Sequence, residues 1–538
     1  MSSGLHLVVT SHHALIGPVA LVVSAAFPWL LAIGTRLFGQ RVTARLAWVP
    51  VGSAVLAGIE IARSGPSAVG VAVTGGQFVA GLWVDSYSVT LVVLVTLVGA
   101  LVQVFSLRHL QSDARAARFA ARAHVLVGAM VVVAGSATLA GLVVGWVAAG
   151  MAFTSLLGYR PDLAGVEQSV ATTRKVFVAG DAAIVVAACW LIARAGNVEV
   201  GPAQGLRSAA AHMGNAGPIV AMLVVIAALA RSAQFPLGRW MTGTVNAPTP
   251  VSALLHAGVV NGGGILLVRM DPLITSSLAA TLLVLGCATV TLLLCTMAIR
   301  ARADVKGSLV MSTRAQMGFM LVECAVGLPV FATIHLVGHA LYKATLFLGS
   351  GGGIRRPGRR PIRPERSQRA LSGISPVLAG TAAAAVVLAV MLTMPGHPAG
   401  GRSWPLLVFA GATAGALGRA WWHARPRGWG WPVVAAIGLA GAGAAYTALL
   451  LGLEGWLSAT VHTGAATPIG PWYLVVLGGL LVLLVLVVGN WSPAASIPAL
   501  LVPTGVVAGR SRGPSRTWLR RMPGIVSGAT IGWDRAAG

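Results

Sequence analysis

Charged residues are scarce in this 538-residue chain, and acidic residues are the scarcest. Only 9% of the residues are charged, with 13 Asp and Glu against 38 Lys and Arg. Soluble domains carry roughly 25% charged residues, so a soluble protein is excluded. The hydrophobic fraction is 56%, and its apolar runs are continuous rather than alternating. This pattern predicts an all-α polytopic membrane protein and excludes an outer-membrane barrel.

Cysteine is also rare, and the basic excess is not gathered on one face. The four cysteines lie inside apolar runs without a CxxC spacing, which favours buried small hydrophobes over a metal site. The net charge of +25 comes from arginines in short loops between apolar runs. We therefore expect anionic membrane lipids as partners and no nucleic acid. No metal, cofactor or catalytic residue is predicted.

The lengths of the apolar runs predict about fifteen membrane spans at about 20 residues each. The first run, Ala14 to Ile33, has no basic residue before it and three arginines soon after it. This order is the reverse of a secretory signal, so we expect an uncleaved first span with the amino terminus outside. The expected spans start near Ala14, Leu46, Ser86, His124, Leu142, Arg174, Gly217, Val251, Ser277, Gly307, Pro329, Ser375, Trp404, Pro432 and Trp472.

With these spans, basic residues alternate between the two sides of the membrane. The odd-numbered loops hold Arg36, Arg41 and Arg45; Arg108, Arg115, Arg118 and Arg122; Arg160; Arg300, Arg302 and Lys306; and Arg419, Arg425 and Arg427. The even-numbered loops are nearly free of cations. The positive-inside rule then predicts a multi-pass protein of the cell inner (plasma) membrane with a cytoplasmic carboxyl terminus.

A cation is expected inside the membrane beside a broken helix. Arg231 ends the apolar run that starts near Gly217, and Pro236 follows it and should break or kink the helix. Charges at this depth usually face a bundle interior and mark an ion or proton path, although an Arg-Pro helix end at the membrane interface has the same pattern. We predict a broken helix near Pro236, of the kind that transporters use to line a cavity.

Two aspartates accompany other apolar runs. Asp85 opens the run through Leu101 and is expected at the membrane interface. Asp181 lies deeper in its own run. It either pairs with Arg174 or Lys175 to orient the helix or belongs to a proton path, and the sequence leaves both readings open.

The clearest constellation of titratable residues is a histidine and lysine stripe. His335, His339 and Lys343 are spaced i, i+4 and i+8, which places them along one helix face over about 12 Å. Histidine titrates near neutral pH, so the stripe is suited to passing protons. An HxxxH metal site is the competing reading, but no acidic residue adjoins it as in a metalloprotease helix. Glu323 in the preceding span is the expected partner.

Three more residues are candidates for the same path. His256 lies roughly two turns into the span that follows Pro248 and Pro250; alone, it would read as a buried histidine bonded to a backbone carbonyl. Asp304 and Lys306 are expected to pair at the cytoplasmic end of their span.

Several segments, in this order, resemble the antiporter-like membrane subunits of respiratory complex I over roughly residues 80 to 355. They are Arg231 to Pro236, Ala247 to Ala257, Asp304 to Lys306, Ser312-Thr313 with Gln316-Met317-Gly318, and His335 to Phe347. Within that superfamily, His256 to Gly264 and His339 to Ala344 look most like DabB, the membrane subunit of an inorganic-carbon accumulation system. The resemblance implies two inverted five-helix repeats. It also implies a cytoplasmic DabA-like partner that resembles a zinc carbonic anhydrase and hydrates CO2 to bicarbonate.

Three positions depart from the complex I pattern. Trp146 is followed by Val147 where those subunits carry a glutamate, and Arg231 stands where they carry a lysine. Arginine does not deprotonate in proteins, so Arg231 can bias a proton path but cannot relay a proton. The run Ser375 to Met394 has no charge where those subunits place a second lysine. Each departure favours the DabB-like reading.

The expected organisation follows from the spans and the resemblance. It comprises the first spans (1–122), a first repeat (123–270), a second repeat (271–421) with a basic linker (355–369), the last spans (422–491) and a basic cytoplasmic tail (492–538). The linker and tail are expected to contact the partner or anionic lipid. Their candidate contact residues are Arg355, Arg356, Arg359, Arg360, Arg363, Trp518, Arg520 and Arg521.

The expected function is that of a transport subunit without enzymatic activity of its own. It would conduct protons or another cation and couple this flow to CO2 hydration and bicarbonate accumulation by the partner. The alternative is a proton-translocating subunit of a complex I-like, hydrogenase-like or multisubunit cation/proton antiporter assembly. A scaffold that only anchors an enzyme would require the buried histidines to be inert.

Overall fold

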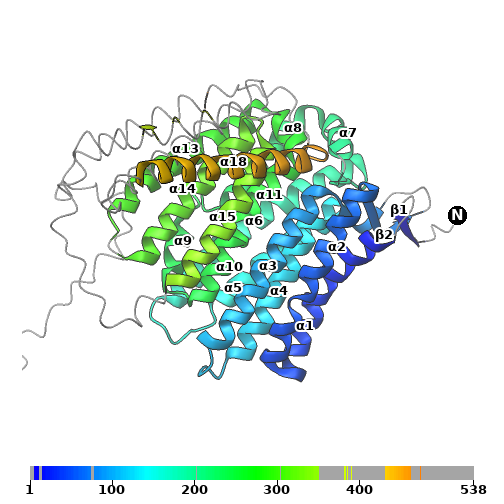
Figure 1. Ribbon diagram of the computed structural model, residues 1–538. Coiled ribbons are helices and arrows are strands. Elements are labelled where there is room, and N and C mark those ends of the chain that lie inside the picture. Colours follow the sequence, from blue (N-terminus) through cyan, green and yellow to red (C-terminus); the bar gives the residue numbers. More distant parts are fainter. Residues whose placement is uncertain are drawn as a thin grey trace, which may run out of the picture. The chain divides into compact units, whose positions relative to one another are not determined.

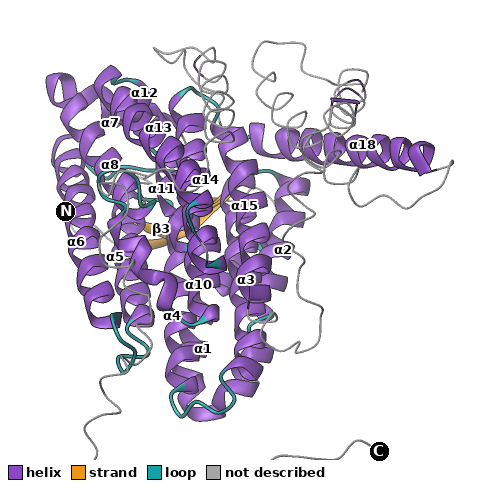
Figure 2. Cartoon of the chain, turned by 90° about the vertical axis from the view of Figure 1, so that its left-hand side faces the viewer, coloured by secondary structure: helices purple, strands orange, loops and turns teal. Residues whose placement is uncertain are grey.

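Long helices that run side by side form most of the described chain (Figure 1, Figure 2). The computed structural model describes residues 5–10, 15–73, 78–201, 203–302, 304–350 and 431–461 and a few isolated positions such as Tyr473. Within these ranges, nine helices are long and apolar enough to cross a membrane. The spans expected near Ser375, Trp404 and Trp472 lie outside the described residues, so a total of about fifteen spans remains a prediction.

The first part of the bundle consists of the helices up to the first break. They are α1 (Ile16–Leu46), α2 (Val49–Ser64), α3 (Ser86–His109), α4 (Ala116–Gly135), α5 (Leu139–Leu157), α6 (Val166–Ala195), the short α7 (Ala203–Met213) with the 3-10 turn η1 (Gly214–Ala216), and α8 (Gly217–Arg231).

The second part of the bundle mixes short and long helices. They are α9 (Arg239–Thr242), η2 (Gly243–Asn246), α10 (Thr249–Ala257), η3 (Val259–Asn261), α11 (Gly262–Arg269), α12 (Asp271–Thr275), α13 (Leu278–Arg300), α14 (Val305–Ala325), α15 (Pro329–Gly349) and α18 (Trp431–Ser458). The last begins one residue before the expected start at Pro432. It contacts α15 and α3, and the Trp456 indole donates to Thr90 Oγ1 at 3.0 Å.

A small antiparallel sheet corrects the expectation that the chain is helical throughout. β1 (Leu5–Thr10), β2 (Ser67–Val73) and β3 (Phe78–Val84) pair in the order β1-β2-β3. Their sequences are LHLVVT, SAVGVAV and FVAGLWV, and none shows the clear apolar-polar alternation that predicts a strand. The sheet lies beside the amino terminus at one end of the bundle (Figure 1), which we call the sheet end.

Loops fall at two opposite ends of the helices. Bridges from Leu82 to Ser136 and from Thr138 to Glu199 place the α4–α5 and α6–α7 connections at the sheet end. At the other end, Arg115 of the α3–α4 connection pairs with Asp162 of the α5–α6 connection, with 3.1 Å between Nη1 and Oδ1. We call this the arginine end.

Two helices begin earlier than the apolar runs suggest. α4 starts at Ala116 rather than His124, and α6 starts at Val166 rather than Arg174. Arginine and lysine are good helix formers, so basic residues beside an apolar run extend the helix instead of ending it. As a consequence, Arg174 lies within α6.

The helix break expected near Pro236 is present, and side chains satisfy the backbone there. α8 ends at Arg231 and the next helical turn starts at Arg239. The Phe235 amide donates to Thr291 Oγ1 at 2.7 Å, and Arg314 Nε donates to the Ala233 carbonyl at 3.1 Å. Such partners are what allow irregular backbone to persist at membrane depth.

A second break was not expected. α10 ends at Ala257, and Gly258 and the turn η3 separate it from α11. Ser232 Oγ, just beyond α8, donates to the Val260 carbonyl at 2.8 Å. The two broken helices are therefore bonded to each other at their breaks, which fixes the position of His256 two residues before Gly258.

Candidate functional site

The titratable residues predicted for the proton path gather where α10, α14 and α15 meet. α15 contacts both α10 and α14. We call the set from these three helices the histidine–lysine cluster. It consists of His256, Glu323, His335, His339 and Lys343.

An acid–base pair forms the part of the cluster nearest the sheet end. Glu323 lies near the end of α14, and its Oε2 is 2.9 Å from Nδ1 of His335 on α15. The two side chains are 10% and 16% exposed. The predicted partnership between Glu323 and the stripe is therefore present, and it involves His335.

The two inner histidines are buried without hydrogen-bond partners. His339 is 4% exposed and His256 is fully buried. Among the described residues, no group bonds to either ring nitrogen of either histidine. The His339 ring lies 6.4 Å from that of His335, and the His256 ring stacks on Phe347 at 4.2 Å.

Lys343 ends the stripe on the side of the arginine end. Its side chain is fully buried, and Nζ donates to Ser312 Oγ at 2.8 Å and to the Leu309 carbonyl at 3.5 Å. His339 lies within electrostatic reach of Lys343, His335 and His256. The spacing of i, i+4 and i+8 thus brings the three groups to one buried face of α15.

This arrangement is suited to moving protons. Buried polar atoms in proteins almost always have a protein or water partner, so four unpaired ring nitrogens make a polar interior that favours internal water. Imidazole accepts a proton on one nitrogen and can release one from the other. Among the described residues, no three His, Cys, Asp or Glu side chains gather as metal ligands.

Arg231 forms a second buried site with Asp181. Arg231 Nη2 lies 2.7 Å from Asp181 Oδ1 and donates to the Trp146 carbonyl at 3.1 Å. The guanidinium also lies 4.3 Å from the Trp146 ring centre and 4.5 Å from that of Phe177. Pairing of Asp181 with Arg174 or Lys175 of its own helix is therefore wrong, because its carboxylate points to α8 instead.

The space for this pair depends on a residue without a side chain. A Cβ at Gly150 of α5 would lie 3.0 Å from Arg231 Nη2 and 3.3 Å from Asp181 Oδ2. The pair lies beside Trp146, which precedes Val147, the position where the resemblance implies a glutamate in complex I subunits. Asp181 of α6 supplies a carboxylate there from a different helix.

Asp304 and Lys306 do not form the expected ion pair. Asp304 is exposed and caps α14 by accepting from the Gly307 amide. Lys306 Nζ donates to the Ala247 carbonyl at 3.0 Å, just before α10. A carboxylate at the N-cap position accepts hydrogen bonds from the free backbone amides of the first helical turn. Asp304 therefore bonds to the Gly307 amide and not to the Lys306 side chain. Lys306 instead ties α14 to the segment that leads to His256.

Sequence reasoning missed a buried ion pair at the sheet end. Asp85 is only 3% exposed and Arg269 is 7% exposed, so both charges are buried within the protein. Arg269 Nη1 lies 4.0 Å from Asp85 Oδ2. Each residue stands at the edge of an apolar run, and a charge in that position is usually assigned to the membrane interface. The sequence shows only that both charges adjoin spanning segments, which does not predict that they pair.

The proposed contact residues of the linker and tail, from Arg355 to Arg363 and from Trp518 to Arg521, lie outside the described residues. Their role stays a prediction.

Comparison with known proteins supports the fold and the family. The family profile described as NADH:quinone oxidoreductase/Mrp antiporter, TM, matches residues 136–412. A profile for the N-terminus of complex I chain 5 matches residues 71–120. In fold, the chain resembles part of the Mrp complex from Dietzia sp. DQ12-45-1b, with a TM-score of 0.64 and 23% identity over 92% of this chain and 58% of that one.

Curated relatives include the probable inorganic carbon transporter subunit DabB1 of Halothiobacillus neapolitanus, which is 32% identical over 60% of this chain and 60% of its own length. NADH-quinone oxidoreductase subunit L of Mycobacterium tuberculosis is 31% identical over 55% of this chain and 46% of its own length. The chain thus matches roughly half to three fifths of the length of these relatives. The predicted resemblance to DabB subunits is confirmed. Because the first profile covers more than half of the chain, the protein belongs to the NADH:quinone oxidoreductase/Mrp antiporter transmembrane family.

Proposed function

We propose that this chain is the proton- or cation-conducting membrane subunit of an energy-coupled inorganic carbon transporter. It couples ion flow to CO2 hydration and bicarbonate accumulation by a cytoplasmic, zinc-dependent, DabA-like partner. The partner rests on the similarity to relatives named DabB.

The observation that carries the proposal is the burial of the histidine–lysine cluster. Ionisable groups inside a membrane are costly and persist mainly where they serve an ion or proton path. Here Glu323, His335, His339 and Lys343 follow one another along the contact between α14 and α15. Unpaired ring nitrogens at His339 and His256 leave room for protons to hop. Arg231 and Asp181 bias the path electrostatically.

The arginine end is the cytoplasmic side in this proposal, in accord with the positive-inside rule. A hollow of about 650 Å3 opens there, and it is lined by Asp113, Arg115, Lys306 and Thr249, among others. Thr249 begins α10, the helix that carries His256. The hollow therefore gives the cytoplasm a polar approach to the cluster.

The test is inorganic carbon uptake by a carbon-starved host that expresses the chain with its partner. Lys343→Ala and His339→Ala should reduce uptake at least tenfold while the complex still co-purifies. Lys343→Arg should fail as well, since arginine keeps the charge but does not release a proton. The matched control is Leu341→Ala, whose side chain is 39% exposed on the same helix. Normal uptake in Lys343→Ala, His339→Ala and Lys343→Arg would show that the chain acts only as a scaffold.

A second candidate is supported by the likeness to subunits of respiratory and antiporter complexes. In that case the chain is a proton-translocating subunit of a complex I-like, hydrogenase-like or multisubunit antiporter assembly. Val147 in place of a glutamate counts against it. Co-purification distinguishes the two candidates, since a large zinc-binding soluble protein indicates carbon uptake and quinone-reductase or antiporter subunits indicate the alternative.

A further inference from the structure

A small polar cavity lies at the sheet end, beside the Asp85–Arg269 pair and apart from the histidine–lysine cluster. Its volume is about 40 Å3, and a water molecule needs only roughly 10–15 Å3. Its lining includes two carboxylates and two cations. These are Asp85, Asp271, Arg207 and Arg269.

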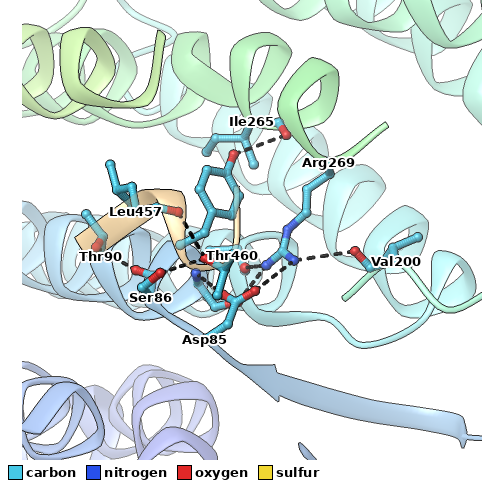
Figure 3. Close-up of polar contacts among 11 residues, drawn as sticks. Asp85, Ser86, Thr90, Val200, Ile265, Arg269, Leu457 and Thr460 are labelled. Atoms are coloured by element: carbon cyan, nitrogen blue, oxygen red, sulfur yellow. Dashed lines mark hydrogen bonds and ion pairs between the residues drawn. The ribbon is translucent and has the colours of Figure 1, made fainter. Parts of the chain in front are cut away.

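Arg269 is held in place by several elements at once (Figure 3). Nη2 donates to Ser88 Oγ of α3 and to the Ala134 carbonyl of α4, both at 2.6 Å, and Nη1 donates to the Val200 carbonyl at 3.4 Å. Its Nε has no partner among the described residues. The guanidinium is therefore a rigid, buried positive charge at the cavity wall.

Asp85 faces this charge without closing on it (Figure 3). One carboxylate oxygen caps α3 by accepting from the Ser88 amide at 2.6 Å, and the other stays 4.0 Å from Arg269 Nη1. This separation exceeds a hydrogen bond and suits a bridging water. The Tyr87 ring lies 4.9 Å from the guanidinium and its hydroxyl bonds to the Ile265 carbonyl, so the ring closes one side.

Asp271 is the carboxylate of the cavity that can exchange protons. It begins α12, in the connection between two spans, and its side chain has no hydrogen-bond partner among the described residues. Burial raises the pKa of Asp271 to about 7, against the opposing effect of Arg207 on α7. Other charges around the cavity are those of Asp85 and Arg269, and Glu323 lies on α14, which α12 contacts. Asp271 therefore gains or loses a proton near neutral pH.

The cavity touches the start of α15, the helix that carries three residues of the histidine–lysine cluster. Pro329, the first residue of α15, lines it, and His335 lies farther along that helix. Cys324 lies within electrostatic reach of both Glu323 and Asp271. The gap between the cavity and the Glu323–His335 pair is thus bounded by the ends of α14 and α15.

We propose that Asp271, with the Asp85–Arg269 pair beside it, is the port that connects the histidine–lysine cluster to the aqueous phase at the sheet end. This inference rests on the proposed function. A proton from water binds the Asp271 carboxylate and then passes through cavity water to the Glu323–His335 pair, which leaves Asp271 as a carboxylate again. Arg269 and Asp85 keep the cavity polar and hydrated.

The test uses the full-length chain with its co-purifying partner, reconstituted in vesicles with an internal pH dye. A potassium potential drives protons inward while the external pH is varied from 6 to 8. In the wild type, protonation of Asp271, with a pKa of about 7, should change the rate about tenfold between pH 6 and pH 8. Asp271→Asn should slow the flux and abolish this dependence, whereas Asp271→Glu should preserve it.

Control variants separate the port from the proposed function. Glu199→Gln, at the same end but outside the cavity lining, should leave rate and profile unchanged. If Lys343→Ala blocks flux and Asp271→Asn conducts with the wild-type profile, the port is wrong and the proposed function stands. If Lys343→Ala also conducts normally, the proposed function fails. Should Asp271→Asn not assemble, Asp271→Ser is measured in its place with the same two outcomes.

Discussion

Arg231 carries a permanent positive charge into the bundle, since arginine does not lose its proton in proteins. Its contacts with Asp181, Trp146 and Phe177 use the charge, the planar donors and the aromatic faces together. Lysine could not make all of these contacts from one position. Arg231 is therefore a fixed positive charge that cannot relay a proton.

Removing the partner of this charge should destabilise the protein. Asp181→Asn leaves Arg231 buried without a counter-ion, which typically costs about 3 kcal/mol or more. We expect a lower midpoint of thermal unfolding for the solubilised protein. Glu167→Gln, at the exposed start of the same helix, is the control and should have no effect. An unchanged midpoint in Asp181→Asn would mean that water or other groups stabilise the Arg231 charge without the carboxylate.

The sequence predicted single residues better than it predicted their partners. The stripe of His335, His339 and Lys343 could be recognised because helical spacing alone puts them on one face. The Asp85–Arg269 pair could not, since only the fold brings α3 and α11 together. Asp181 shows the same limit, because its depth was evident but its partner lies on another helix.

At the scale of helices, the packing of α5 against α6 and α8 depends on Gly150. The nearest atoms to an added Cβ there belong to the Arg231–Asp181 pair. Gly150→Ala should displace this pair and cost about 1–3 kcal/mol. Gly338→Ala is the matched control, because an added Cβ on α15 meets nothing within 4 Å.

The two glycine variants should therefore move in opposite directions. Alanine has the higher helix propensity by roughly 1 kcal/mol, so Gly338→Ala should keep or raise the midpoint of thermal unfolding while Gly150→Ala lowers it. Equal midpoints would show that α5 can move away from the pair without loss.

The loops of the arginine end should respond to acid. The Arg115 amide, followed by Tyr159 and Arg160, holds the pKa of Asp113 below its usual range, and hydrogen bonds from Arg160 hold that of Asp162 lower still. Carboxylates with lowered pKa values stabilise the loops above about pH 4, and this contribution is lost as the pH falls through those values.

Hydrogen exchange of the backbone amides in 110–116 and 158–165 measures this effect. Protection, corrected for the intrinsic exchange rate, should be constant from about pH 5 to 8 and should fall below about pH 4. Arg160→Ala should lower protection at every pH in the upper range. A change in the wild type between pH 5 and 8 would assign the loops' stability to other groups.

The break in α8 was predictable, whereas the break after α10 was not. Pro236 predicts the break after α8 because proline cannot donate a backbone hydrogen bond. The second falls at Gly258, among several glycines that also fit a tightly packed helix, and no residue there forbids a helix. Its cause is tertiary, since the Val260 carbonyl accepts from Ser232 across the two breaks.

Across the whole molecule, polar openings lie at both ends and the histidine–lysine cluster lies between them. The hollow at the arginine end adjoins α10, and the cavity at the sheet end adjoins α12 and α15. The hollow and the cavity lie toward opposite ends of the contact between α10, α14 and α15. The proposed function requires a proton path between these two ends, and the loop charges predict which end faces the cytoplasm.

The arginine-rich loops predict the orientation of the bundle in the membrane. Ser112 and Ser276 are exposed in connections at the arginine end and the sheet end, respectively. In a Cys189→Ser background, Ser276→Cys in intact cells should react with a membrane-impermeant thiol reagent, while Ser112→Cys should react only after permeabilisation. The physical reason is that arginine-rich loops are retained on the cytoplasmic side. The reverse labelling would invert the topology, and the Asp271 cavity would then face the cytoplasm and take protons from there.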